Sequence, residues 1–207
     1  VGVCMLPDAG RQGLALSLCI RLPRELPGAA REVYPVWRKS RGIILAGPPA
    51  SGKTTVLRDL CRMISVGEQE GPCRTVLIDE RNELSGTTEG HAAMNLGIRT
   101  DIMEGIPKAA AIPMLVRSMA PDVIITDELS GAIDTEAVSE AAKYGIAVIA
   151  SIHAGNTAQL RSKAWLRHAV EDGLFAKVFL LRRTSREISL YETDILDENK
   201  RRRITRC

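Results

Sequence analysis

Residues 47–55, GPPASGKTT, have the residue types and the spacing of a phosphate-binding loop: Gly47, four residues, Gly52, then Lys53 and Thr54. Glycines let the backbone turn tightly, so that its N–H groups surround phosphate oxygens at the positive end of a helix. The lysine of such a loop reaches the β- and γ-phosphates, and the threonine hydroxyl binds Mg²⁺. The loop therefore predicts binding of ATP with Mg²⁺. The residues expected to contact the nucleotide are Gly47, Pro48, Pro49, Ala50, Ser51, Gly52, Lys53, Thr54 and Thr55.

A second candidate is the pair of acids in DVIITDEL, where Asp127 and Glu128 follow an aliphatic run. This is the Walker B arrangement. Asp127 is predicted to hold Mg²⁺ through water, together with Thr54, while Glu128 orients and deprotonates the attacking water. The alternative interpretation is an acidic pair that faces solvent at the end of a strand.

Charged groups also follow two other aliphatic runs. Glu80 lies in IDERNEL and His153 in ASIHAG. Glu80, together with Asp79, is predicted to belong to a second group of acids at the nucleotide, and His153 to detect the γ-phosphate. The alternatives are a surface salt-bridge cluster around Glu80, which contributes little stability, and a hydrogen-bonded structural role for His153.

Positively charged side chains are needed to stabilise the negative charge on the γ-phosphate as it is transferred. Arg81 in IDERN, Arg99 in GIRTD and Arg117 in LVRSM are the candidates, because all three lie between the second aliphatic run and the acidic pair. Such arginines accelerate phosphoryl transfer by about 10³ to 10⁵. Such arginines are predicted to act across a subunit interface, and the alternative for Arg99 and Arg117 is that they are surface residues paired with acids.

The elements that must position these residues are strands alternating with helices. Val/Ile/Leu/Ala runs at 42–46, 73–80, 121–128 and 146–154 are separated by segments with helical periodicity. Such a pattern predicts an α/β fold with a mostly parallel sheet covered on both faces. Ligands bind at the carboxyl ends of such strands, where the candidate residues lie. Residues 174–183 and 186–194 predict a closing hairpin.

Three regions are expected along the chain. They are the C-terminal end of an N-terminal domain with a linker (1–35), a P-loop ATPase domain (36–195) and a basic tail (196–207). The chain is accordingly expected to be a piece of a longer protein.

Composition narrows the classes of protein. The 207 residues are 45% hydrophobic and 26% charged, with 3% aromatic residues and a net charge of +3. No apolar run approaches the ~20 residues that cross a bilayer, and the first 20 residues lack a signal-peptide pattern, so the protein is expected to be cytoplasmic. Five scattered cysteines predict reduced thiols. With few aromatic residues to stack bases, no nucleic-acid partner is expected.

Five segments, in order, resemble the stage III sporulation protein AA family, which is related to type II and type IV secretion ATPases. They are GPPASGKTTVLRDL, VLIDERNEL, GIRTDIMEGIPKA, LVRSMAPDVIITDEL and IASIHAG, and the similarity covers residues 15–192. The resemblance implies a RecA-like ATPase of the ASCE type. It also implies that Glu80 supports hydrolysis, that Glu128 is the Walker B acid and that His153 is the sensor.

The resemblance further implies a hexameric motor on the mother-cell side of a sporulation membrane complex. Its partners would be membrane proteins of a channel between mother cell and forespore, which it would energise or help to assemble. The sequence departs from the family pattern in lacking most of the amino-terminal domain and in the loop DELSG after Glu128.

Two other functions fit a P-loop domain. A small-molecule kinase would need an acceptor pocket and a lid, for which residues 82–107 are a candidate. Glu128 argues against it, because an activated water is unwanted in a kinase. A nucleic-acid-dependent RecA-like ATPase is the other alternative, and its only basic cluster would be NKRRRITR near the C-terminus.

Overall fold

The computed structural model describes most of the chain. The described residues are 2–7, 15–21, 25–40, 42–67, 71–87, 89, 91–183, 188–193, 195–196 and 201–206. The helices are α1 (Tyr34–Ser40), α2 (Lys53–Val66), α3 (Lys108–Ser118), α4 (Ala132–Lys143), α5 (Thr157–Arg161) and α6 (Ala164–Glu171). The strands are β1 (Gly2–Pro7), β2 (Ala15–Arg21), β3 (Ile43–Gly47), β4 (Thr75–Asp79), β5 (Thr100–Glu104), β6 (Val123–Thr126), β7 (Ala147–His153), β8 (Lys177–Arg183), β9 (Ile188–Thr193) and β10 (Arg201–Arg206).

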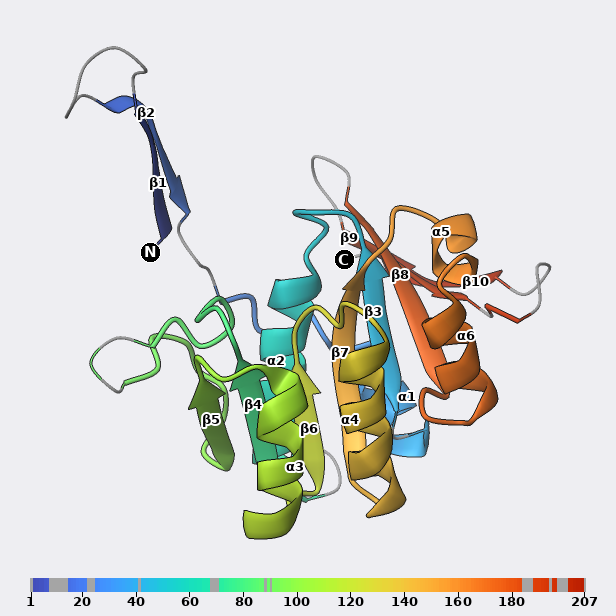
Figure 1. Ribbon diagram of the computed structural model, residues 1–207. Coiled ribbons are helices and arrows are strands. Elements are labelled where there is room, and N and C mark those ends of the chain that lie inside the picture. Colours follow the sequence, from blue (N-terminus) through green and yellow to red (C-terminus); the bar gives the residue numbers. More distant parts are fainter. Residues whose placement is uncertain are drawn as a thin grey trace.

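Eight of these strands form one twisted sheet in the order β10-β9-β8-β3-β7-β6-β4-β5 (Figure 1). The strands from β8 to β5 are parallel, and β9 and β10 continue the sheet with antiparallel pairing. Strands β1 and β2 pair with each other in a separate antiparallel hairpin. The mixed α/β fold with a mostly parallel sheet is as predicted.

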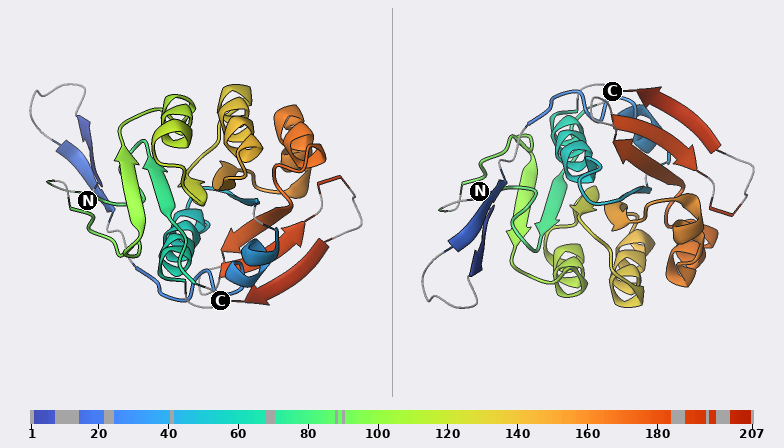
Figure 2. Two further views of the ribbon diagram at one scale, coloured as in Figure 1. Left: turned by 90° about the horizontal axis from the view of Figure 1, so that it is seen from below. Right: turned by 90° about the horizontal axis from the view of Figure 1, so that it is seen from above.

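Helices cover both faces of the sheet, because successive side chains of each strand point to opposite faces. In β3, Ile44 and Ala46 pack in the core beneath α3, α4 and α6, while Ile43 and Leu45 pack beneath α1 and α2. The two helical layers are seen end-on in Figure 2. The central strands are therefore buried on both sides, which explains their nearly continuous aliphatic sequences.

Helix α2 begins at Lys53, within the phosphate-loop sequence, and is followed by a glycine. Its apolar residues recur every three or four positions and pack on the sheet. Gly67 ends it with φ 75°, and its N–H donates to the Met63 carbonyl at 2.9 Å. This left-handed conformation suits glycine because it has no Cβ.

The structure differs from the sequence-based expectation at three elements. Strand β5 was not predicted, and it extends the sheet beyond β4. Residues 201–206 were expected to lie in a basic tail, yet β10 pairs with β9. A proline inside a helical segment normally ends or kinks the helix, yet α3 runs through Pro113 to Ser118.

Residues on both sides of position 35 pack into one core. Ala30, Val33 and Tyr34 are fully buried in the same cluster as the apolar face of α2. The division of the chain at residue 35 stays a prediction. None of the helices among the described residues combines the length and apolar character needed to cross a bilayer.

Candidate functional site

Four neighbouring strands bring the candidate residues to one edge of the sheet. Strands β3, β7, β6 and β4 lie side by side and run in the same direction. At or directly after their carboxyl ends lie Gly47, His153, Asp127 and Asp79. Parallel strand pairing alone therefore brings together residues that are up to about a hundred positions apart in the sequence.

The loop between β3 and α2 has the backbone of a tight anion cradle. Gly52 and Ala50 have positive φ angles of 98° and 58°. A Cβ added at Gly47 would lie 2.4 Å from Ser51 Oγ, so the loop tolerates no side chain there. The Ser51 hydroxyl is buried and has no hydrogen-bond partner among the described residues. A buried, unpaired hydroxyl is costly, so a phosphate oxygen in the loop would satisfy it.

Lys53 is folded back over this loop. Its Nζ donates to the carbonyl oxygens of Gly47 and Pro48, both at 2.9 Å, and lies 3.4 Å from His153 Nδ1. The side chain is almost completely buried. Burial lowers the pKa of the Lys53 amine, and the negative charge of Glu128 opposes that shift.

Glu128 joins the acidic pair to the loop. Its Oε1 lies 2.5 Å from His153 Nε2, and its Oε2 lies 3.8 Å from an Arg81 guanidinium nitrogen. The backbone of Glu128 has a φ of 24°, an uncommon value for a non-glycine residue, and its N–H donates to Ser151 Oγ at 3.0 Å. A continuous chain of contacts therefore runs from Lys53 through His153 and Glu128 to Arg81.

Asp127, the residue before Glu128, is buried beside this series of contacts. Desolvation by burial raises the pKa of its carboxyl to about 6, with the positive charge of Lys108 acting in the opposite direction. Most of the group is therefore still ionised at pH 7. Carboxylate and hydroxyl oxygens are ligands that Mg²⁺ accepts in nucleotide sites. Asp127 and the Thr54 hydroxyl thus offer a donor set that fits this ion.

Glu80 is bound by Lys108, a residue that the sequence-based reasoning missed. Lys108 Nζ lies 2.9 Å from Glu80 Oε2, and the Lys108 backbone N–H donates to Glu80 Oε1. The lysine side chain is only 4% exposed. A cation in the first turn of a helix opposes the helix dipole. A lysine at the start of a predicted helix is therefore unfavourable unless an acid neutralises it, so Lys108 could have indicated a nearby acid from the sequence alone.

The ion pair between Lys108 and Glu80 is expected to stabilise the folded protein. Lys108→Met leaves the Glu80 carboxylate without its cation, which should lower the free energy of unfolding by about 2–3 kcal/mol, less than for a fully buried pair because Glu80 is partly exposed. Urea unfolding measures it. Lys143→Met, in the exposed pair with Glu140, is the matched control and should change stability by less than about 0.5 kcal/mol. Equal losses in both variants would contradict the importance assigned to the Lys108–Glu80 pair.

The Asp79 carboxylate stabilises the turn after β4 and does not face the phosphate loop. It is fully buried, and its carboxylate accepts hydrogen bonds from the N–H groups of Glu83, Leu84 and Ser85 at 2.7–3.0 Å. Arg58 of α2 donates to the carbonyls of Leu84 and Glu83. The turn after β4 is thereby fastened to both the strand and the phosphate-loop helix.

The structure does not bring Arg99 and Arg117 to this edge. The Arg99 carbonyl accepts from the N–H of Thr75, the first residue of β4, so Arg99 lies at the amino end of the sheet. Arg117 lies in the last turn of α3, about 14 Å along the axis from Lys108, which contacts Glu80. Both side chains are exposed. Within one chain, neither faces the phosphate loop.

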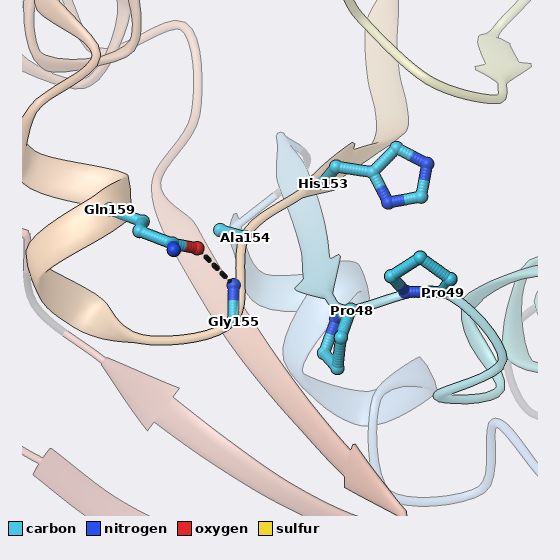
Figure 3. A pocket seen from close by; sticks show the side chains of 6 residues that line it. All are labelled: Pro48, Pro49, His153, Ala154, Gly155 and Gln159. Carbon is cyan, nitrogen blue, oxygen red and sulfur yellow. Dashed lines mark hydrogen bonds between the residues drawn. The ribbon is translucent and has the colours of Figure 1, made fainter.

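An open pocket of about 420 Å³ adjoins the loop (Figure 3). It is lined by Pro48, Pro49, His153, Ala154, Gly155 and Gln159. Gln159 is held by a hydrogen bond from the Gly155 N–H to its Oε1 at 2.6 Å. The pocket thus connects the beginning of the phosphate loop with His153 and the segment that follows β7.

Fold and site together define a P-loop domain, and comparisons with known proteins agree. The model of the family "Sporulation stage III, protein AA" matches residues 13–198. Stage III sporulation protein AA of Bacillus subtilis (strain 168) is 34% identical over 187 residues, which are 88% of this chain and 61% of that protein. The chain belongs to this family, and it spans about three fifths of the length of that relative.

Solved structures show the fold. The pilus retraction motor PilT with bound ADP has a TM-score of 0.60 at 15% identity, covering 92% of this chain and 62% of PilT. The VirB11 ATPase of the Brucella suis type IV secretion system, in complex with sulphate, has a TM-score of 0.51 at 19% identity and covers 84% and 50%. The RecA-like P-loop fold is therefore confirmed.

Proposed function

We propose that this chain is the catalytic domain of an ATP-hydrolysing motor or assembly ATPase that acts in endospore formation. The observation that carries the proposal is the chain of contacts from Lys53 through His153 to Glu128. It joins a phosphate cradle to an acid that can activate water. Membership of the sporulation family and the ATPase fold support the same conclusion.

In the proposed mechanism, Lys53 exchanges the carbonyls of Gly47 and Pro48 for the β- and γ-phosphate oxygens. The loop N–H groups from Ala50 onward and the Thr55 hydroxyl hold the remaining oxygens. Thr54 and Asp127 would hold Mg²⁺, the latter through water. When bound, that ion neutralises phosphate charge. Lys108 keeps Glu80 in place beside Asp127.

Glu128 acts as the general base. Its carboxylate orients a water molecule and accepts its proton as the water oxygen attacks the γ-phosphorus and the bond to the β-phosphate oxygen breaks. His153, which touches both Lys53 and Glu128, detects the γ-phosphate and its loss. The segment after His153 leads into α5, so this residue can pass the change to the surface.

The assembly is proposed to be a homo-oligomer, a hexameric ring in the full-length protein. Arg99 and Arg117 would then reach the γ-phosphate of a neighbouring subunit, since they lie away from the loop of their own chain. We place the protein in the mother-cell cytoplasm, peripheral to a membrane complex. Its partners would be membrane proteins of the channel to the forespore, with no nucleic acid involved.

Phosphate release from ATP, measured without any acceptor substrate, tests the proposal. The activity per chain should rise with protein concentration, because the site is completed by a neighbour, and chelation of Mg²⁺ should abolish it. A specific activity that stays constant on dilution would contradict the shared site. ATP that stays intact until a small molecule or DNA is added would favour a kinase or a nucleic-acid-dependent ATPase instead.

A further inference from the structure

The candidate site has an imbalance of charge close to the position of the transferred phosphate. Asp127 and Glu128 lie at the end of β6, and ATP brings further negative charge. Lys108 is bound to Glu80, and Arg58 is bound to the carbonyls of Glu83 and Leu84. Besides Lys53, a further cation at this edge of the sheet would offset that negative charge.

Arg81 is placed to supply that charge. It follows Glu80 directly at the end of β4, and its guanidinium lies 3.8 Å from Glu128 Oε2. His153 contacts the other oxygen of the same carboxylate. The Arg81 side chain is 71% exposed, so its ion pair with Glu128 is weak and easily exchanged.

The backbone beneath Arg81 is held firmly although the side chain is exposed. Asp79, two residues earlier, accepts from the N–H groups of Glu83 and Leu84. Arg58 binds the carbonyls of the same two residues from α2, the helix that begins with Lys53. The turn that carries Arg81 thus has a fixed position relative to the phosphate loop.

We infer that Arg81 is a catalytic residue that contacts the γ-phosphate from within the same chain. When ATP binds, the guanidinium leaves Glu128 Oε2 for the γ-phosphate oxygens, a match that its planar set of donors favours. The exchange also leaves Glu128 Oε2 open to the attacking water. This inference rests on the proposed function, and it is independent of any arginine from a neighbouring subunit.

Loss of a residue that contacts only the γ-phosphate should weaken the binding of ATP and leave the binding of ADP unchanged. The test compares the dissociation constants of fluorescent ADP and of a non-hydrolysable ATP analogue, each measured with Mg²⁺. Arg81→Ala should weaken binding of the ATP analogue by ~10-fold or more, since a charge-assisted contact is lost, and should change ADP binding by less than about twofold. Arg81→Lys should recover part of the loss.

Arg74→Ala is the matched control. Arg74 lies just before β4, at the opposite end from Arg81, and it is 62% exposed with an ion pair to Asp122 at 3.7 Å. This variant should bind both nucleotides like the wild type. Equal weakening for ADP and the ATP analogue in Arg81→Ala, or no weakening of either, would overturn the inference while leaving the proposed function intact. A folded wild-type protein that binds neither nucleotide would overturn both.

Mixing variants separates action within a chain from action across an interface. A mixture of Arg81→Ala and Lys53→Ala chains should show no recovery of phosphate release, because no chain in the mixture carries both the cradle and its own arginine. Recovery in this mixture would show that Arg81 serves the neighbouring subunit and would overturn the inference.

Discussion

Replacing Lys53 with alanine is expected to abolish nucleotide binding. Lys53 is a compact cation whose ammonium already lies at the phosphate loop, 2.9 Å from the carbonyls of Gly47 and Pro48. Without it, the β- and γ-phosphates lose their point charge. Titration with a fluorescent nucleotide should show affinity reduced by ~100-fold or more, to the limit of detection.

The variant is expected to fold, so that the loss can be assigned to binding. Burial lowers the pKa of the Lys53 amine, which means that the charged group carries a desolvation cost that alanine removes. Lys143→Ala, which removes an exposed lysine near the end of α4, is the control and should bind like the wild type. Unchanged affinity in folded Lys53→Ala would mean that this loop is not the phosphate cradle.

Replacing Glu128 with glutamine is expected to stop hydrolysis while nucleotide binding is retained. Glutamine keeps the shape of the side chain and an oxygen that can accept a hydrogen bond from His153, but it cannot take a proton from water. Phosphate release should fall by ~10² to 10⁴, the usual contribution of a general base. Affinity for ATP should change by less than about threefold.

Glu140→Gln is the control for this change, because Glu140 is partly exposed on α4 and pairs with the surface residue Lys143. It should hydrolyse ATP at the wild-type rate. Wild-type phosphate release in the Glu128→Gln variant would remove the hydrolytic role from this residue. A kinase would be nearly insensitive to the same change.

The sequence predicted the central elements of the fold because their signals are local. The glycine spacing of residues 47–52 and the aliphatic run before Asp127 each lie within one short segment. Both faces of these strands are buried, so their composition alone indicates a covered parallel sheet. Strand β5 is only partly buried and contains Asp101 and Glu104, so it lacks the aliphatic run that reveals the central strands.

The order of the strands and the partners of the acids could not be predicted in the same way. No pattern within a single segment of the sequence indicates that β7 lies between β3 and β6 in the sheet. Asp79 and Glu80 looked like equivalent site acids in the sequence. The structure separates them, because Asp79 binds backbone N–H groups while Glu80 binds Lys108. Such distinctions depend on contacts between residues far apart in the chain.

The arginines illustrate the same limit. Arg81, Arg99 and Arg117 are all candidates by their place between two strands in sequence, yet Arg99 lies at the amino end of the sheet and Arg117 in the last turn of α3. Arg81 lies next to the site because it directly follows the carboxyl end of β4. Position relative to a strand end is therefore the better guide to the site than position between motifs.

The identity of the nucleotide retained by the protein tests the central claim most directly. Wild-type and Glu128→Gln proteins are incubated with ATP and Mg²⁺, freed rapidly of unbound nucleotide, denatured and analysed by chromatography. The proposed mechanism predicts ADP from the wild type and intact ATP from the variant. Intact ATP in the wild type, or ADP in the variant in the same amount as in the wild type, would contradict it.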